Sequence, residues 1–432
     1  MSVPAGTEGE PRRFVAGRIR FQNALAALRH RNFRLFFLGS ALSLIGTWMQ
    51  TVAEGWLVYE LTGDPLALGF IRFLHTVPVT GLTLVGGALA DRMDKRRILL
   101  RTQTGSMFLA LALFGLVVSG KVEVWHIAVI GLGLGLAHSF DIPARQAFLI
   151  EMVGKKDLMN AIALNSSMFN GARIVGPSIA GLLTGAAGWL GLTAMGALAG
   201  CFLFNGISFL GVIVAYLAMK LPKREVTSKS KPIGQATREA IRYVLSHREL
   251  RSILFLVTIV SLFGWPYSVL MPIYAGDVFG LKATGYSYLM AANGVGAFLG
   301  ALSLTTLGDY PNKHRLLAGG FGVFCLGLLI LAQVSDGITA GFVLALIGWA
   351  MIFFFATANT IVQINVADDL RGRVMGIYSF CFLGISPFGS LLAGWAAKVW
   401  SAPLTVGIGA GICAVAGLLV FGRQWLSPQL RG

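Results

Sequence analysis

Long apolar segments alternate with short polar ones along almost the whole chain. A helix needs roughly 20 apolar residues to cross the hydrocarbon core of a membrane. The pattern therefore predicts twelve membrane-spanning helices, at 35–60, 67–90, 98–118, 125–148, 158–185, 190–219, 252–275, 284–308, 315–334, 338–364, 374–397 and 402–422.

The longest polar interruption divides these helices into two groups of six. It lies at 220–251 and carries nine Lys and Arg residues. The expected fold is an all-α membrane protein in which two pseudo-symmetric six-helix bundles surround a central cavity. The predicted parts are a basic N-terminus, the first bundle, a basic linker, the second bundle and a tail, at 1–34, 35–219, 220–251, 252–422 and 423–432.

Within the linker, apolar residues from Ile233 to His247 recur near helical spacing between basic residues. This pattern favours a helix on the membrane surface. A solvated basic linker is the alternative.

Composition excludes a water-soluble protein of this size. Of the 432 residues, 55% are hydrophobic and only 12% are charged, and the mean hydropathy is +0.72. The net charge of +16 is typical of nucleic-acid binding in a soluble protein, but here its distribution indicates membrane topology. With the N-terminus inside, 30 of the 35 Lys and Arg residues fall on one side. We expect a multi-pass protein of the cell (inner) membrane with both termini cytoplasmic, the lipid bilayer as a partner and no nucleic acid.

Residues that would hold a metal or cofactor are scattered. The four cysteines lie singly in apolar runs without a CxxC spacing, the six histidines are dispersed, and no GxxxxGK[ST] loop is present. We expect no metal, no cofactor and no enzymatic activity. Met1 to Arg34 lacks a signal-peptide core, so the first span is expected to stay as a signal anchor.

Short motifs repeat between the two groups of helices. GALADRMDKRR (Gly87 to Arg97) follows the second span, and TTLGDYPNKHR (Thr305 to Arg315) follows the eighth. GPSIAG in the fifth span (Gly176 to Gly181) matches GSLLAG in the eleventh (Gly389 to Gly394). Small residues at repeated positions predict close helix packing in both bundles.

The segment Gly87 to Arg97 fits the pattern G-x-x-x-D-R-x-x-[RK]-R and resembles the signature loop of the major facilitator superfamily. AEGWLVYELTGDPLALG, DIPARQAFLIEMV and NAIALNSSMFNGARIVGP resemble its drug and siderophore exporters of the transmembrane secretion effector type. With the helix count, the resemblance covers nearly the whole chain. Asp94 is a departure, because the family usually has glycine there, and it leaves the tightness of the turn open.

The resemblance also implies a gating contact on the cytoplasmic side. Asp91 would meet the N-terminal end of the eleventh helix, whose dipole favours an anion, and Arg92 would pair with an acid of the fourth helix. Asp141 is the candidate acid, although Asp141 and Arg145 can also pair at i, i+4, on a face shared with His138. The alternative is that these cations only set the topology. The gating candidates are Gly87, Asp91, Arg92, Lys95, Arg96, Asp141 and Arg145.

Ionisable side chains inside spans are costly and so carry functional information. Glu54 ends a polar stripe of the first span, and Arg72 lies at a similar depth in the second span. They could form a salt bridge. As a functional pair, Glu54 would couple protons and its protonation would free Arg72; the alternative is a fixed structural pair.

Further polar and aromatic residues could line a cavity for a large amphipathic substrate. Arg173 near the middle of the fifth span suits an anionic substrate or a gate, with an ion pair to a neighbouring helix as the alternative. The aromatic candidates are as compatible with packing as with binding. The cavity candidates are Ser43, Thr47, Gln50, Asn170, Arg173, Trp265, Tyr286, Asn293, Asn359 and Gln363.

Together these features predict a secondary active transporter, a proton-driven exporter of small amphipathic molecules that acts by alternating access as a monomer. Proton-coupled uptake is the alternative direction, because the sequence fixes the membrane topology better than the direction of transport. A non-transporting assembly factor is a weaker alternative. A channel is disfavoured by the two related halves.

Overall fold

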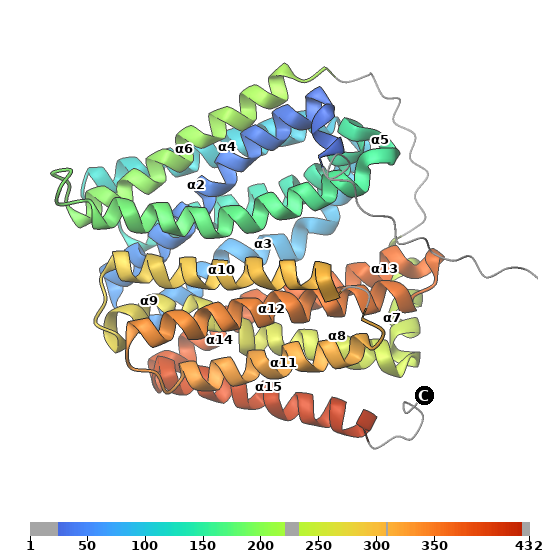
Figure 1. Cartoon of the computed structure of the whole chain (residues 1–432). Coiled ribbons are helices and arrows are strands. Elements are labelled where there is room, and N and C mark those ends of the chain that lie inside the picture. Colours follow the sequence, from blue (N-terminus) through green and yellow to red (C-terminus); the bar gives the residue numbers. More distant parts are fainter. Residues whose placement is uncertain (1–24, 221–232, 308–309, 426–432) are drawn as a thin grey trace, which may run out of the picture.

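The computed structural model of the protein describes residues 25–220, 233–307 and 310–425 (Figure 1). These residues form helices and turns, without a strand. Eleven helical segments among them are long and apolar enough to cross a membrane. The long helices are α2 (Arg31–Thr62), α3 (Pro65–Arg92), α4 (Lys95–Val118), α5 (Val124–Gly185), α6 (Ala194–Ala218), α10 (Ala283–Leu307), α11 (Lys313–Leu331), α12 (Gly337–Asn365) and α15 (Ala402–Trp425).

Helix α5 explains why eleven segments correspond to the twelve predicted spans. It has 62 residues, far more than one crossing needs. At Gly154 the backbone has φ 70° and ψ 179°, a conformation that essentially only glycine adopts. The helix folds back at this residue, so α5 supplies both the fourth and the fifth span. The predicted twelve-span fold is confirmed.

The remaining two spans are broken into shorter pieces. One runs from Arg248 to Val278 through α8 (Arg248–Ile259), η2 (Val260–Gly264), η3 (Trp265–Val269), α9 (Met271–Ile273) and η4 (Tyr274–Val278). The other consists of α13 (Asp368–Ser379), η5 (Phe380–Gly384) and α14 (Ser386–Val399). Both contain π-helical segments, η2 and η4 in the first and η5 in the second, and the Ser261 hydroxyl of η2 donates to the Phe382 carbonyl of η5. The sequence pattern predicted one span at each place, at 252–275 and 374–397, without these π-helical segments.

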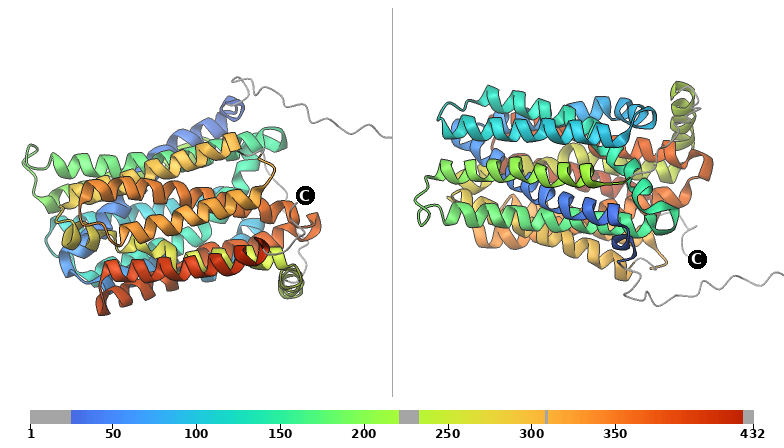
Figure 2. Two further views of the ribbon diagram at one scale, coloured as in Figure 1. Left: turned by 60° about the horizontal axis from the view of Figure 1, so that its bottom comes forward. Right: turned by 90° about the horizontal axis from the view of Figure 1, so that it is seen from above.

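The helices form two halves (Figures 1 and 2). In the first half, α2 and α4 each pack against α5 and α6, and α3 packs against α5. In the second, α12 packs against α10 and α11, and α11 packs against α15. We call the end of the molecule where α6 finishes and α8 begins the linker end, and the opposite end the far end.

Two helix pairs join the halves: α3 packs against α14, and α5 against α10. Small residues bring these backbones close together, because a Cβ added at Gly69 would lie 2.5 Å from the Ser390 carbonyl oxygen and 3.0 Å from Gly394 Cα. A Cβ added at Gly181 would lie 3.1 Å from Ser287 Cβ of α10. The two repeated glycine motifs therefore each contribute a residue, Gly181 and Gly394, to the interface between the halves.

Aspartates start several helices. The Asp94 side chain accepts a hydrogen bond from the Arg96 backbone N–H and caps α4, and Asp64 likewise caps α3 through Leu66. Asp94, which departs from the family pattern, thus has a local role that glycine lacks.

A short helix, α7 (Ile233–Ser246), lies at the linker end, where the sequence allowed either a surface helix or a solvated linker. Its Glu239 pairs with Arg373 of α13 at 3.0 Å. In Figure 1 this helix runs across the ends of the second half. Asp309, which has the same place in the motif Thr305 to Arg315 as Asp91 has in Gly87 to Arg97, lies outside the described residues.

Candidate transport site

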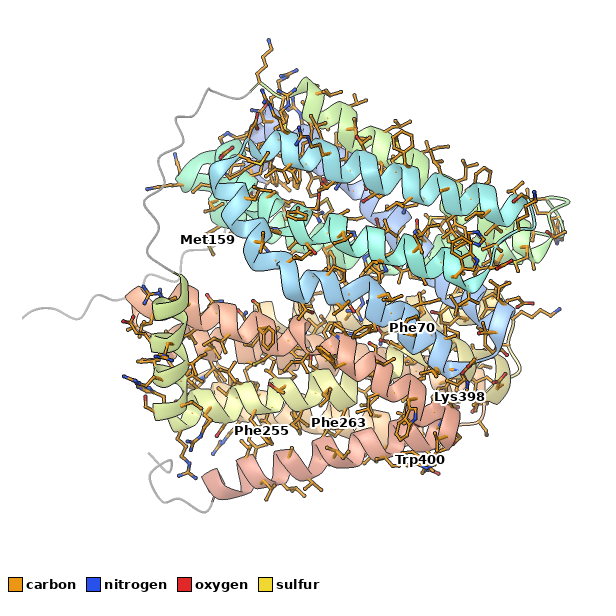
Figure 3. The ribbon with its side chains drawn as sticks, turned by 180° about the vertical axis from the view of Figure 1, so that it is seen from behind. Phe70, Met159, Phe255, Phe263, Lys398 and Trp400 are labelled. Carbon is orange, nitrogen blue, oxygen red and sulfur yellow. The ribbon has the colours of Figure 1, made fainter. Side chains whose placement is uncertain are left out.

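Polar contacts between the halves close the far end. The Lys398 ammonium lies 2.6 Å from the Asp64 carboxylate, and the Tyr59 hydroxyl donates to the Asp277 carboxylate at 2.6 Å. Figure 3 shows Lys398 near this end. All four residues lie at or near helix ends, and none of them is among the site residues predicted from the sequence. In the sequence they are marked only by a charge or a hydroxyl group beside a loop that is predicted at the far end.

An arginine joins the halves near the middle of the helices. Arg173 of α5 donates to the Asn293 side-chain carbonyl of α10 at 2.7 Å, and its guanidinium lies 5.7 Å from the centre of the Trp48 ring. Asn293 in turn donates to the Tyr267 hydroxyl at 2.8 Å and to the Leu344 carbonyl at 3.1 Å. Two residues predicted separately as cavity candidates therefore contact each other across the interface.

Glu54 lies inside the first half with only 8% of its surface exposed. It interacts electrostatically with Arg72 and with the Gln50 amide. The structure describes no direct ion pair between the Glu54 and Arg72 side chains. Arg72 also interacts with Tyr286 of α10, which stacks on Trp56 at a ring separation of 5.9 Å. Arg72 thus interacts both with the Glu54 carboxylate and with a residue of the second half.

The polar stripe of α2 faces the interior of its own half. Gln50 accepts a hydrogen bond from Asn205 of α6 at 2.6 Å, Thr47 lies 3.5 Å from the same Asn205, and Ser43 is buried close by. Helical spacing correctly placed these residues on one face, but it could not identify the neighbour of that face. They line cavities that are bordered only by helices of the first half, α2 to α6.

The remaining cavity candidates of the second half lie in two places. Trp265 packs among aromatic rings, with Phe382 at 4.9 Å and Phe355 at 5.6 Å. Asn359 accepts a hydrogen bond from Gln363 one helical turn away, on the part of α12 nearer the linker end. In the first half, Asn170 donates to its own helix, at the Ser166 carbonyl.

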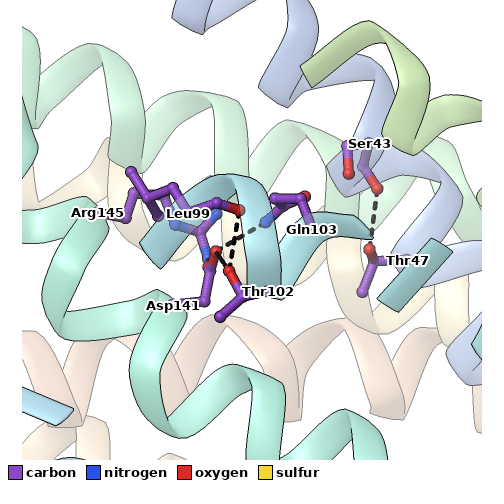
Figure 4. Close-up of polar contacts among 7 residues, drawn as sticks. All are labelled: Ser43, Thr47, Leu99, Thr102, Gln103, Asp141 and Arg145. Atoms are coloured by element: carbon purple, nitrogen blue, oxygen red, sulfur yellow. Dashed lines mark hydrogen bonds and ion pairs between the residues drawn. The ribbon is translucent and has the colours of Figure 1, made fainter. Parts of the chain in front are cut away.

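The charged cluster predicted on the fourth span is present (Figure 4). Asp141 pairs with Arg145 at 2.7 Å and is only 1% exposed. It also accepts hydrogen bonds from Gln103 at 2.7 Å and from Thr102 at 3.1 Å. These contacts cross-link α4 and α5. The predicted alternative partner, the Arg92 side chain, lies outside the described residues, as does the Asp91 side chain.

The other basic candidates tie helices of the first half together at the linker end. Lys95 pairs with Glu151 of α5 at 2.8 Å, and Arg96 donates to the Leu217 carbonyl of α6 at 2.7 Å. Gly87, the first residue of the signature segment, would have no atom within 4 Å of an added Cβ. Among the described residues, no group of three or more His, Cys, Asp or Glu is arranged to hold a metal ion.

Two helical halves that pack against each other through α3 and α14 and through α5 and α10, with ionisable side chains inside the spans, are typical of membrane transporters. The family model for transmembrane secretion effectors matches residues 22–428. The chain belongs to this family, a branch of the major facilitator superfamily, whose members are transporters and not enzymes.

Comparison with known proteins agrees with this membership. The chain is 27% identical to the staphyloferrin A transporter of Staphylococcus aureus, over 90% of this chain and 95% of that protein. It is 26% identical to the multidrug efflux pump Tap of Mycolicibacterium fortuitum, over 83% of this chain and 88% of that protein. Its fold resembles that of a bacterial homologue of the human lysosomal transporter Spinster, in an inward-facing and occupied conformation, with a TM-score of 0.70 and 13% identity over 92% of this chain and 97% of that one.

Proposed function

We propose that this transporter is a proton-driven exporter of small amphipathic molecules and that it works by alternating access. The linker end is cytoplasmic in this proposal, because it carries most of the Lys and Arg residues, as the positive-inside rule requires. Both termini then lie in the cytoplasm.

The proposal rests on the positions of the polar contacts between the two halves. The inter-half polar contacts that the structure describes lie at the far end or near the middle of the helices: Lys398–Asp64, Tyr59–Asp277, Thr284–Thr184, Arg173–Asn293 and Thr80–Gly384. Toward the linker end the helices of the two halves diverge (Figures 1 and 3). This arrangement suits a state that takes up substrate from the cytoplasm.

Residues near the diverging ends suit an amphipathic substrate. Met159, labelled in Figure 3, is 77% exposed, and Phe169 and Ile364 are also exposed apolar side chains toward the linker end. Arg173 lies deeper, at the point where the halves meet, and adds a positive charge. The names of the relatives, a staphyloferrin A transporter and the multidrug efflux pump Tap, also support small molecules as the substrates.

Coupling is assigned to Glu54 and Arg72. A carboxylate that ionises inside a membrane protein changes the local field strongly. When Glu54 is ionised it attracts Arg72; when it is protonated, Arg72 is left to interact with Tyr286 of the second half. Protonation of Glu54 thereby alters a contact between the halves, which is what a coupled transporter needs.

At the cytoplasmic side we assign gating to Asp91 and Arg92, following the family resemblance. Asp91 would approach the start of α13 when the linker end closes. Lys95, Arg96, Asp141 and Arg145 then keep the helices of the first half together while it moves as a body. The protein is expected to act as a monomer.

The proposal is tested by transport of a panel of dyes, drugs and iron chelators into everted membrane vesicles that contain the protein. The expected result is accumulation of at least one compound, lost when a proton uncoupler is added. A matched preparation with Glu54→Gln controls for passive leakage. Extrusion from the vesicles would instead favour uptake in the cell, and no flux of any compound would contradict the transport proposal.

A further inference from the structure

Two small cavities lie in series inside the first half. The larger, of about 50 Å³, is enclosed by α2, α4, α5 and α6, and the smaller, of about 20 Å³, by α2, α3, α5 and α6. Thr47, His138 and Phe209 line both cavities, so they adjoin at these residues. A cavity needs roughly 10–15 Å³ of such space to hold one water molecule. Both are therefore large enough for water, and we call them together the cavity column.

The walls of the cavity column are polar enough to hold water. Ser40, Ser43 and Ser106 line the larger cavity, and Gln50 and Asn205 line the smaller one. Gln103, at 8% exposure, also lines the larger cavity, and its Oε1 atom has no hydrogen-bond partner among the described residues. A buried acceptor without a protein partner is normally satisfied by an ordered water. This atom therefore indicates where a water would bind.

Titratable side chains follow the cavity column from one end to the other. Glu54 lies at the end of the smaller cavity nearer the far end, and Tyr216 lies at the end of the larger cavity nearer the linker end. Between them the imidazoles of His75 and His138 stack with ring centroids 5.5 Å apart. The charged groups that face the two histidines are Arg72 of α3, Glu54 of α2, and Asp141 and Arg145 of α5.

His138 is placed to pass a proton between the two cavities. It is the only titratable residue among their described linings that belongs to both. A neutral imidazole has one nitrogen that accepts a proton and one N–H that donates, so it can take a proton on one side and release another on the opposite side. His75, stacked on it, lines only the smaller cavity and faces the Glu54 side.

We propose that the cavity column is the route by which a proton leaves Glu54 for the linker end, with His138 as the relay between the two cavities and His75 as its partner. This inference rests on the proposed proton-driven export. The carboxylic acid of Glu54 gives its proton to a water of the smaller cavity, and His138 accepts a proton there. His138 then releases a proton to water in the larger cavity, and Glu54 is left as the carboxylate.

The route separates protons from substrate. In the arrangement observed, contacts such as Lys398–Asp64 close the far end, so a proton on Glu54 has to leave toward the linker end. The space between the halves is where substrate enters in the same state. A path inside the first half lets the proton leave while that space is occupied.

The test uses the full-length protein in proteoliposomes with a pH-sensitive dye in the lumen and a substrate identified by the vesicle panel. Two readouts are compared: proton movement coupled to net substrate transport, and substrate–substrate exchange, which needs no net proton movement.

In His138→Gln and His75→Gln the coupled proton movement is expected to fall by about tenfold or more, since a proton-transfer group typically contributes ~10²–10⁴ in rate. Exchange is expected to stay within about twofold of the unmodified protein, because these side chains line cavities inside the first half. His126→Gln, a histidine on the same helix but outside both cavities, is the matched control.

A second variant tests the cavity column without changing a histidine. Ser106→Leu fills part of the larger cavity with an apolar side chain and should slow proton movement more than exchange, whereas Ser119→Leu at the exposed end of the same helix should change neither. If a histidine variant misfolds and therefore loses exchange, Ser106→Leu still tests whether the proton passes through the cavity column. Normal coupling in His138→Gln or in a correctly folded Ser106→Leu overturns this inference alone. An unmodified protein that transports substrate without proton movement overturns the proposed coupling and this route with it.

Discussion

Removing the charge of Asp64 should shift the protein toward the state that is open at the far end. Asp64 has two roles: one carboxylate oxygen accepts from Leu66 N–H at 2.9 Å and caps α3, and the other pairs with Lys398 at 2.6 Å. Asparagine is also a good helix cap. Asp64→Asn therefore keeps the cap and removes the ion pair between the halves.

The size of the shift follows from exposure. The Lys398 side chain is 52% exposed and the Asp64 side chain 29% exposed, so solvent screens the pair. Such pairs contribute about 0.2–1 kcal/mol. Losing that much changes the ratio of the two states by up to about fivefold, because 1.4 kcal/mol corresponds to a factor of about ten.

The shift can be measured as the distribution of distances between spin labels at Ser119→Cys in the first half and Ser335→Cys in the second. Both residues are exposed at the far end. Asp64→Asn should increase the population with the longer distance, and high salt should produce a similar shift in the unmodified protein. Lys121→Met removes a far-end charge elsewhere and serves as the control. Equal populations in Asp64→Asn and the unmodified protein, or an equal shift in Lys121→Met, would refute the assigned role of this ion pair.

Three further outcomes are expected. Glu54→Gln should abolish transport driven by a pH gradient while leaving the thermal unfolding of the purified protein unchanged, because glutamine keeps the size but cannot ionise; unchanged coupling would remove Glu54 from the mechanism. Asp91→Asn should slow substrate exchange without abolishing equilibrium substrate binding, and a loss of binding would contradict its gating role. Gly154→Ala should lower the unfolding temperature, because the backbone conformation of Gly154 costs other residues about 1–3 kcal/mol; Gly171→Ala, at a helical position with open space around it, should not lower it.

The fold was largely predictable because lipid leaves few choices. Backbone groups inside a bilayer have to bond within their own helix, so long apolar runs can be assigned to spans from length alone. The turn at Gly154 was also visible, since the polar pair Lys155 and Lys156 follows it. The breaks in the span from Arg248 to Val278 were not predicted. Its prolines, Pro266 and Pro272, lie within an apolar run, and hydropathy alone does not register the backbone hydrogen bonds that proline removes.

The contacts between the candidate site residues could not be predicted from the sequence. Arg173 and Asn293 were each predicted as cavity residues because they are polar groups inside spans. They lie 120 residues apart in different halves, and only the packing of α5 on α10 brings them together. Lys398 and Asp64 are 334 residues apart and looked like ordinary loop charges. His75 was missed because a single histidine in an apolar span gives no pattern until its stacking on His138 is known.

The direction of proton movement tests the central claim of proton-driven export most directly. A substrate found with the vesicle panel is added outside proteoliposomes that carry a pH indicator in the lumen and no imposed gradient. Exchange of substrate for protons predicts that the luminal pH rises as substrate enters, and that Glu54→Gln abolishes the rise. A luminal pH that falls would indicate that substrate and protons move together, and a pH that stays constant during substrate entry would contradict proton coupling.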